Sequence, residues 1–258
     1  MELFRFKNLS EFNDLEHFVS TRKGGFSKPP FEFNNMSLEC NDIHTIINRK
    51  ELSEILNLPL ENFVYQYQTH TKNVIIINQS HKGRGTTDIN DALQDNDAMI
   101  TSEKQICIVA MAADCVPVLL FDSENKIVAA IHSGWKGTIQ EITKTTVQKM
   151  IDEFNSKPEN IFAGIGPSIG KCCYEIGNEV AEKIKSKLEY SDKVLFFNNK
   201  TQKFHFDLWL ANKLQLEKIG INTKNIEIAE ICTKCNQDFY YSARNNDLGR
   251  FSAGIFLK

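Results

Sequence analysis

The sequence lacks a strong excess of either charge. Its 258 residues include 30 Lys and Arg against 33 Asp and Glu, which gives a formal net charge of -3. A chain with this balance has no general attraction to nucleic acid or to an anionic membrane, so a phosphate-bearing ligand must be held by local basic groups. The composition therefore favours small-molecule partners over nucleic acid.

Long apolar runs are also absent. No stretch of about eighteen apolar residues is available to cross a bilayer, and the first residues lack the apolar core of a signal peptide. Disulfides are rare in reducing compartments, and the seven cysteines are an odd number. These features predict a cytoplasmic protein with no membrane partner, in which most cysteines are reduced thiols.

The chain has no internal repeat, low-complexity tract or Pro/Gly-rich linker, and its six prolines are scattered. We therefore expect a single domain over residues 1–258. Its irregular N-terminal third, with turns at Gly24-Gly25 and Pro29-Pro30, is expected to form loops.

Apolar runs rich in β-branched residues predict seven strands, and helical spacing of apolar residues predicts three helices. The strands are Val74 to Ile77, Ile106 to Met111, Val116 to Phe121, Ile127 to Ile131, Ile161 to Ile165, Ile226 to Ile231 and Ser252 to Leu257. The helices are Thr138 to Phe154, Glu179 to Leu188 and Asp207 to Lys218. Several strands are apolar on both faces and should be covered on both. The pattern indicates an α/β protein, but adjacent strands with few intervening helices argue against a regular doubly wound sheet.

Three short segments carry side chains that can bind a metal ion or perform chemistry at the ends of strand-like runs. They are Gln68-Thr69-His70, Ala113-Asp114-Cys115 and Ile131-His132-Ser133-Gly134-Trp135. Two imidazoles and one thiol suit a catalytic zinc, which typically keeps three protein ligands and one open position. Because the three residues are far apart in sequence, only the fold can bring them together.

Two neighbouring residues are candidates for supporting roles. Asp114 beside the strand thiol is costly to bury unless it is hydrogen-bonded, and the free ring nitrogen of a ligating histidine is a suitable partner. Lys136 follows His132 in a glycine-containing loop, and Thr138 with Glu141 fits a capping box at the start of the next helix. The helix terminus and Lys136 together suggest a phosphate site; the alternative is an ordinary turn with a surface lysine.

Other motifs give weaker signals. The Cys232-Thr233-Lys234-Cys235 segment has no second cysteine pair or histidine at zinc-finger spacing. The other pair, Cys172-Cys173, is vicinal, and a disulfide within it would be unusual in a reducing compartment. We therefore expect neither pair to bind metal or to serve redox chemistry. The glycines at 164, 166 and 170 miss the dinucleotide fingerprint and indicate a tight loop, with Glu175 behind it as a site carboxylate.

Three arginines lie inside motif-like segments: Arg22, Arg49 and Arg244. Each is suited to bidentate contacts with the oxygens of a nucleoside or phosphate, although the usual place of arginine is the solvated surface.

The motifs as a set resemble those of the YfiH family, in the same order and from about residue 20 to the C-terminus. The matching segments are Ser20-Thr21-Arg22-Lys23-Gly24-Gly25, Gln68-Thr69-His70, Ala113-Asp114-Cys115-Val116-Pro117, His132-Ser133-Gly134-Trp135-Lys136-Gly137-Thr138, Gly166-Pro167-Ser168-Ile169-Gly170 and Cys232-Thr233. Members of this family were first described as polyphenol oxidases with laccase activity, and later as zinc-dependent purine nucleoside phosphorylases with accompanying adenosine deaminase activity.

The resemblance implies a layered α/β fold with two mixed β-sheets sandwiched between helices. It also implies that His70, Cys115 and His132 are the metal ligands and the catalytic centre, and that the N-terminal third, including Asn35 and Arg49, contributes to the substrate pocket. The chain departs from the family at Lys136, where Arg is usual, at Ser133, where Ala is usual, and at Ser242-Ala243-Arg244, where an aromatic residue commonly precedes the arginine. These departures concern substrate contacts and not the metal ligands.

The activity expected from the resemblance is phosphorolysis of purine nucleosides to the base and ribose 1-phosphate, with Zn²⁺ as cofactor and adenosine deamination at the same site. The runner-up is a copper-dependent polyphenol oxidase, but six histidines without a His-x-His pair are few for a multicopper centre. A metal-free hydrolase using Cys115 and His132, and a zinc-stabilised binding module, are further alternatives. The protein is expected to be a monomer or homodimer.

Overall fold

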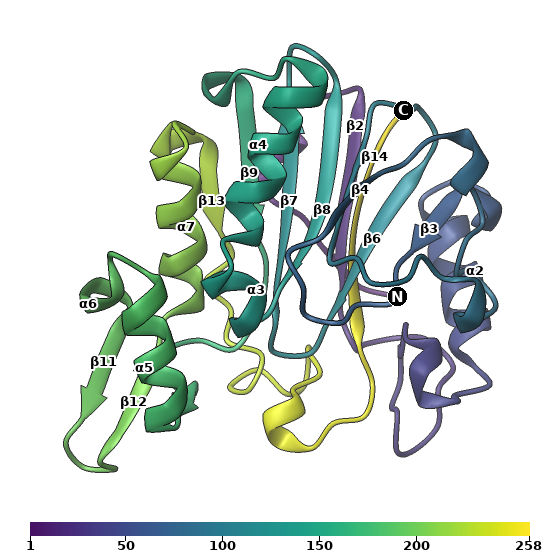
Figure 1. Ribbon diagram of the computed structural model, residues 1–258. Coiled ribbons are helices and arrows are strands. Elements are labelled where there is room, and N and C mark those ends of the chain that lie inside the picture. Colours follow the sequence, from purple (N-terminus) through teal and green to yellow (C-terminus); the bar gives the residue numbers. More distant parts are fainter.

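The computed structural model describes residues 1–258 and contains two large mixed β-sheets and one small antiparallel sheet (Figure 1). In spatial order, the six-stranded sheet consists of β13 (Ile226–Ile228), β9 (Ile161–Ile165), β7 (Val116–Asp122), β8 (Ile127–Ser133), β5 (Ala98–Thr101) and β4 (Val74–Ile76). The five-stranded sheet consists of β1 (Leu3–Phe4), β2 (Leu15–Ser20), β14 (Phe251–Leu257), β6 (Cys107–Ala112) and β3 (Phe63–Tyr65). The small sheet has the order β10 (Glu175–Ile176), β12 (Lys203–Phe206) and β11 (Leu195–Asn198).

Helices lie on the outer faces of the two large sheets. The six-stranded sheet is covered by α4 (Ile142–Phe154) and α7 (Leu208–Lys218), and α2 (Thr45–Ile55) lies against the five-stranded sheet (Figure 1). The helix α5 (Asn178–Lys187) packs against β12 of the small sheet. The remaining helices are short: α1 (Lys7–Ser10), α3 (Trp135–Ile139) and α6 (Ser191–Val194). None of the helices combines the length and the apolar character needed to cross a bilayer.

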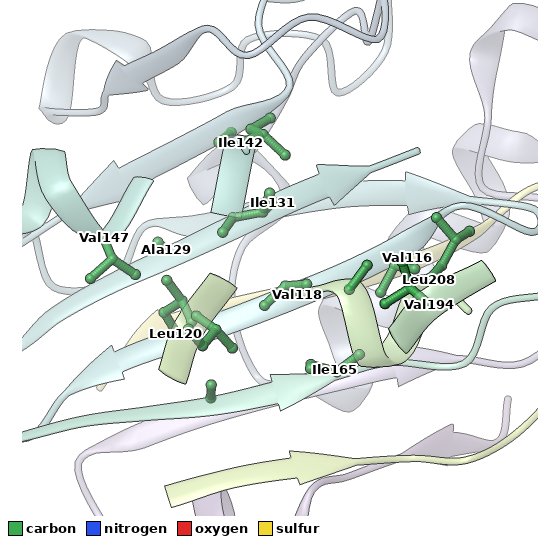
Figure 2. Close-up of a cluster of buried hydrophobic side chains, with 14 of the residues drawn as sticks. Val116, Val118, Leu120, Ala129, Ile131, Ile142, Val147, Ile165, Val194 and Leu208 are labelled. Atoms are coloured by element: carbon green, nitrogen blue, oxygen red, sulfur yellow. The ribbon is translucent and has the colours of Figure 1, made fainter. Parts of the chain in front are cut away.

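The central strand β7 shows why the core strands appear in the sequence as unbroken apolar runs. Successive side chains of a strand point to opposite faces. Leu119 and Phe121 therefore pack between the two sheets, whereas Val118 and Leu120 face the helices. Figure 2 shows this second group together with Ile142 and other buried side chains. A strand covered on both faces has no solvent-facing polar positions.

The seven predicted strands are present, and the layered arrangement of two mixed sheets with helices is confirmed. The prediction of loops in the N-terminal third is wrong in part, because this region contributes β2, β3 and α2. Its strands are short and α2 has a weakly segregated apolar face, so their periodicity in the sequence is faint.

The predicted helix from Thr138 to Phe154 is also wrong in part, because it is divided into α3 and α4. Glu141 lies between them in the left-handed conformation, with φ of 58°, which interrupts the helical path. Thr138 does not cap a helix: it lies inside α3 and its hydroxyl donates to the carbonyl of Gly134. The capping box that the sequence suggested is therefore absent.

Three chain connections cross from one large sheet to the other at the same end of the sandwich. They are residues 66–73 between β3 and β4, residues 113–115 between β6 and β7, and residues 229–250 between β13 and β14. The strand register places Ala112 beside Phe251 in one sheet and Val116 beside Ser133 in the other, so these strand ends lie together. Polar side chains on the three connections are thereby gathered at one rim of the apolar core.

Arg49 is a structural residue of the N-terminal third. Its side chain is 1% exposed and donates hydrogen bonds to the carbonyls of Met36, Gly85 and Thr86, with its guanidinium 3.7 Å from the ring centroid of Tyr65. A further contact from its Nη2 goes to Sδ of Met111 at 3.7 Å, so the guanidinium is bound within the protein. The structure thus gives Arg49 a structural role, and substrate binding by Arg49 stays a prediction.

We expect Arg49→Met to lower the free energy of unfolding by about 3 kcal/mol, because it leaves several buried carbonyls without donors. Urea denaturation measures this loss. The matched control is Arg5→Met, which removes an exposed ion pair to Glu16 and should cost less than about 1 kcal/mol. Unchanged stability of Arg49→Met, with weakened substrate binding, would contradict the structural role.

Candidate metal centre

The rim of the sandwich brings His70, Cys115 and His132 together, as the sequence predicted. His70 lies on the β3–β4 connection, Cys115 ends the three-residue crossing from β6 to β7, and His132 lies in β8 beside Pro117. Their ligand atoms all lie within 4.8 Å of one another, and the two imidazole centroids are 4.9 Å apart. Two side chains from connections and one from a strand thus converge on one small volume.

The backbone around these residues is shaped for close approach. His70 and Asp114 have positive φ of 62° and 80°, a conformation that is uncommon for residues other than glycine and often occurs at functional sites. A Cβ atom on Gly134 would lie 2.7 Å from Nδ1 of His70 and 3.0 Å from Sγ of Cys115. A side chain at position 134 would therefore displace two members of the group.

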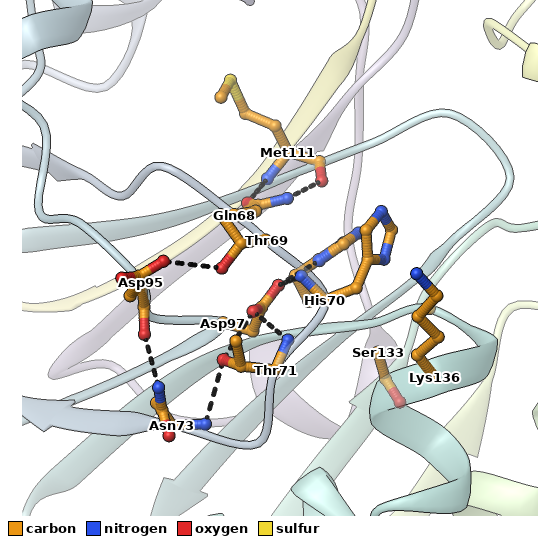
Figure 3. A network of polar contacts seen from close by, with 12 residues as sticks. Gln68, Thr69, His70, Thr71, Asn73, Asp95, Asp97, Met111, Ser133 and Lys136 are labelled. Atoms are coloured by element: carbon orange, nitrogen blue, oxygen red, sulfur yellow. Dashed lines mark hydrogen bonds and ion pairs between the residues drawn. The ribbon is translucent and has the colours of Figure 1, made fainter.

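Asp97 holds the two histidines in place (Figure 3). Nδ1–H of His132 donates to Oδ1 of Asp97 at 2.7 Å, and the backbone N–H of His70 donates to the same oxygen at 3.1 Å. The backbone N–H and the hydroxyl of Thr71 donate to Oδ2 at 2.6 and 2.8 Å. Because a carboxylate only accepts, Nδ1 of His132 carries the proton and leaves Nε2 as the ligating nitrogen.

Asp114 does not have the role predicted from the sequence. Its carboxylate accepts hydrogen bonds from the hydroxyl of Thr233 at 2.6 Å and from the backbone N–H of Arg244 at 2.8 Å, so it joins two crossing connections and not a histidine ring. The carboxylate that supports a histidine is instead Asp97, which the sequence analysis missed. The available signal was an acidic residue immediately before the short apolar run 98–101, a strand that was also missed.

The electrostatics of the two histidines differ. Burial lowers the pKa of His70 and the nearby His132 lowers it further, while the Asp97 carboxylate opposes the shift. Burial also acts to lower the pKa of His132, but the facing Cys115 sulfur and the Asp97 carboxylate outweigh it and raise the pKa to about 10.

These residues fit a divalent metal ion. Nδ1 of His70 is buried and has no hydrogen-bond partner in the protein, which is costly for a polar atom unless another ligand satisfies it. One thiol and two imidazoles are the donor types that zinc prefers, and three protein donors correspond to an open catalytic site. The four other histidines of the chain are not part of the group.

A cavity of about 240 Å³ opens onto the three residues. Its other lining residues are the apolar Met111, Ala112, Ala113 and Ala243 and the polar Ser37, Glu39, Gln68 and Arg250. The sequence analysis did not select Glu39 or Arg250, because each comes from a segment distant in sequence with no motif of its own. Gln68 exchanges hydrogen bonds with the backbone of Met111, which fixes the β3–β4 connection to β6.

The residues that the sequence nominated for substrate do not line this cavity. Asn35 is fully buried and its side-chain oxygen accepts from the backbone N–H of Arg250, so it supports a lining residue from behind. Lys136 is exposed in α3 and extends toward the loop that carries His70 (Figure 3).

The remaining three nominated residues lie in other hollows. Glu175 and Arg244 line a separate hollow, in which Glu175 pairs with Lys203. Arg22 lines another, where it bonds the carbonyls of Glu32 and Gln237. Neither hollow is lined by His70 or His132. Direct contact of Arg22, Glu175 or Arg244 with a ligand in the cavity is therefore not supported.

Comparisons with known proteins agree with the fold and show the family. The chain is 33% identical over 256 residues to a purine nucleoside phosphorylase of Bacteroides thetaiotaomicron, covering 98% of this chain and 95% of the relative. It is 34% identical over 212 residues to adenosine deaminase RL5 of an unknown prokaryotic organism, covering 81% and 80%. The crystal structure of the Bacillus licheniformis hypothetical protein YfiH superimposes with a TM-score of 0.92 at 32% identity, covering 96% and 94%. A family model described as multi-copper polyphenol oxidoreductase laccase matches residues 16–258, and the chain therefore belongs to this laccase-like YfiH family.

Proposed function

We propose that this protein is a zinc-dependent purine nucleoside phosphorylase that also deaminates adenosine. The observation that carries the proposal is the convergence of His70, Cys115 and His132 on one cavity, with Asp97 fixing both histidines. The names of the relatives supply the substrate class: one is a purine nucleoside phosphorylase and another an adenosine deaminase.

The chain contributes a preorganised set of ligands and a mixed cavity wall. His70, Cys115 and His132 would hold zinc, and Asp97 keeps Nε2 of His132 directed at it. Zinc, when bound in such a site, polarises substrate oxygens and lowers the pKa of a coordinated water toward neutrality, which is the chemistry that deamination needs. The apolar side of the cavity, around Met111 and Ala243, suits the face of a purine ring, and Arg250 supplies a cationic group for oxygen atoms.

The donor set supports zinc over copper. A multicopper oxidase requires several copper ions and many imidazole ligands. Here only two histidines join the group, and a single thiolate completes it. The family's laccase description is therefore not supported by the ligands that this chain provides for a trinuclear copper centre.

A metal-free cysteine hydrolase is the second candidate, and one observation favours it. Cys115 faces His132, and Asp97 orients His132. The three residues thus resemble a nucleophile, its base and the acid that orients the base. His70 has no function in that arrangement, although its Nδ1 is buried without a partner. The metal site accounts for all four residues and is preferred.

In the decisive experiment, the purified protein is incubated with adenosine or with inosine, in the presence and absence of phosphate. The products are identified by chromatography. We expect hypoxanthine or adenine with ribose 1-phosphate only when phosphate is present, and inosine from adenosine without it. A His70→Ala, Cys115→Ala, His132→Ala variant should lose one equivalent of zinc and both activities. Full zinc retention in that variant, or hydrolytic activity that survives chelation and disappears on thiol alkylation, would favour the alternatives.

Asp97 and Asp114 form a matched pair of buried carboxylates for testing ligand support. We expect Asp97→Asn to weaken zinc affinity about 10- to 100-fold, the range typical of residues that orient a ligating histidine. Asp114→Asn should change zinc affinity much less, because its partners are Thr233 and Arg244. Competition with a chromogenic chelator measures both affinities, and equal losses would contradict the distinct role of Asp97.

Lys136 tests how the two activities share the site. Its ammonium group lies close enough to lower the pKa of His70, so it can attract phosphate near the centre although it does not line the cavity. We expect Lys136→Ala to lose about tenfold in phosphate-dependent turnover, about 1.4 kcal/mol of transition-state stabilisation, with deamination much less affected.

Two variants control the Lys136 experiment. Lys136→Arg should keep most activity because it preserves the charge. Lys144→Ala removes a lysine that forms an ion pair with Glu141, and it should leave both activities unchanged. Equal loss of phosphorolysis and deamination in Lys136→Ala, with normal zinc content, would show that Lys136 does not act on phosphate.

A further inference from the structure

The structure brings two cysteine pairs together that the sequence analysis treated separately. Cys172-Cys173 follows β9, and Cys232 with Cys235 follows β13. Because β9 and β13 are parallel neighbours, the loops that follow them leave the sheet side by side. Ser168 N–H donates to the carbonyl of Ile231, and Thr233 N–H donates to that of Ser168, which aligns the two loops. The expectation that neither pair could bind metal assumed that no second pair was near, and that assumption is wrong.

The four sulfur atoms are spaced for a single metal ion. All four lie within 4.8 Å of one another, with Sγ of Cys235 3.8 Å from that of Cys172 and 3.4 Å from that of Cys173. With Zn–S bonds of about 2.3 Å, a tetrahedral zinc site has S···S edges of about 3.8 Å. A disulfide needs sulfurs about 2.05 Å apart, and the cysteines here are free thiols.

The backbone around the sulfurs supports a ligand role. The N–H of Gly170 donates to Sγ of Cys232 at 3.3 Å, an interaction that stabilises a thiolate. A Cβ on Gly170 would lie 3.2 Å from Cβ of Cys232 and 3.3 Å from Sγ of Cys172, so glycine allows the two loops to approach. The N–H and the side-chain amide of Asn236 both bond the carbonyl of Cys232, which fixes the turn between the second pair of cysteines.

Two lysines flank the cysteines in the sequence. Lys171 precedes the first pair and Lys234 lies within the second, so two cations are adjacent in sequence to ligands that carry negative charge when a metal is bound. His205 lies nearby, with its Nδ1 bonded to the carbonyl of Lys171, but it is not part of the four-cysteine group. Four protein thiolates leave no open position for water or substrate, which is the property of a structural site.

We propose that Cys172, Cys173, Cys232 and Cys235 bind one Zn²⁺ in a closed site separate from the His70, Cys115 and His132 group. The ion ties the loop after β9 to the connection between β13 and β14. Thr233, inside the second cysteine pair, donates to Asp114 beside Cys115. The tetrathiolate zinc therefore stabilises the rim on which the candidate metal centre is built, without taking part in its chemistry.

The test uses the full chain, purified under reducing conditions, with zinc measured by elemental analysis. We expect the His70→Ala, Cys115→Ala, His132→Ala variant to keep one zinc per chain, and Cys232→Ser, Cys235→Ser to lose one relative to the parent protein. Cys40→Ser is the matched control, because Cys40 lies outside both groups and should leave the zinc content unchanged. Because the first variant lacks the other site, this result does not depend on the proposed activity.

Two further measurements keep the proposal testable if the double serine variant does not fold. Cobalt loaded into the His70→Ala, Cys115→Ala, His132→Ala variant should show thiolate-to-cobalt charge transfer with the intensity of a tetrathiolate site. Removing its zinc with a chelator should lower the melting temperature by about 5 °C or more. Absence of bound zinc with four freely alkylated thiols, disulfides in the protein as purified, or iron in place of zinc would overturn the proposal.

Discussion

The Asp97 carboxylate is the interaction on which the candidate centre depends. It lies at the start of β5 and accepts hydrogen bonds from His132, from the backbone of His70 and from Thr71. One buried anion thus fixes the tautomer of one histidine and the loop position of the other. A buried carboxylate is costly without partners, so the donors that satisfy it are also held in place by it.

The position of the centre follows from the layered architecture. The two sheets bury an apolar layer between them, and His70 and Cys115 lie where the chain crosses from one sheet to the other, beside the end of β8 that carries His132. Such connections have few regular backbone hydrogen bonds, which permits the positive φ angles of His70 and Asp114. The rigid strands on either side then hold those conformations, as is common where loops on a stable scaffold form a site.

The same rim contains two cysteine-containing groups with different chemical character. The His70, Cys115 and His132 group has three protein donors and faces a cavity, whereas the tetrathiolate group has four donors. The hydrogen bond from Thr233 to Asp114 connects the loops that carry them. The connection between β13 and β14 is therefore tied to the loop that carries Cys115 in the candidate centre.

The sequence by itself determined the central strands, the helices α5 and α7, and the three members of the candidate centre. Apolar periodicity is a local property, and His70, Cys115 and His132 stand in motifs that a single chain displays. Only the tertiary structure decided the rest, because each remaining contact joins segments far apart in sequence. Arg49 proved to be a buried donor to the backbone, Asp97 replaced Asp114 behind the histidines, and two separate cysteine pairs became one cluster. Hydrogen-bond partners and metal geometry depend on distances between strand ends, and sheet pairing sets those distances.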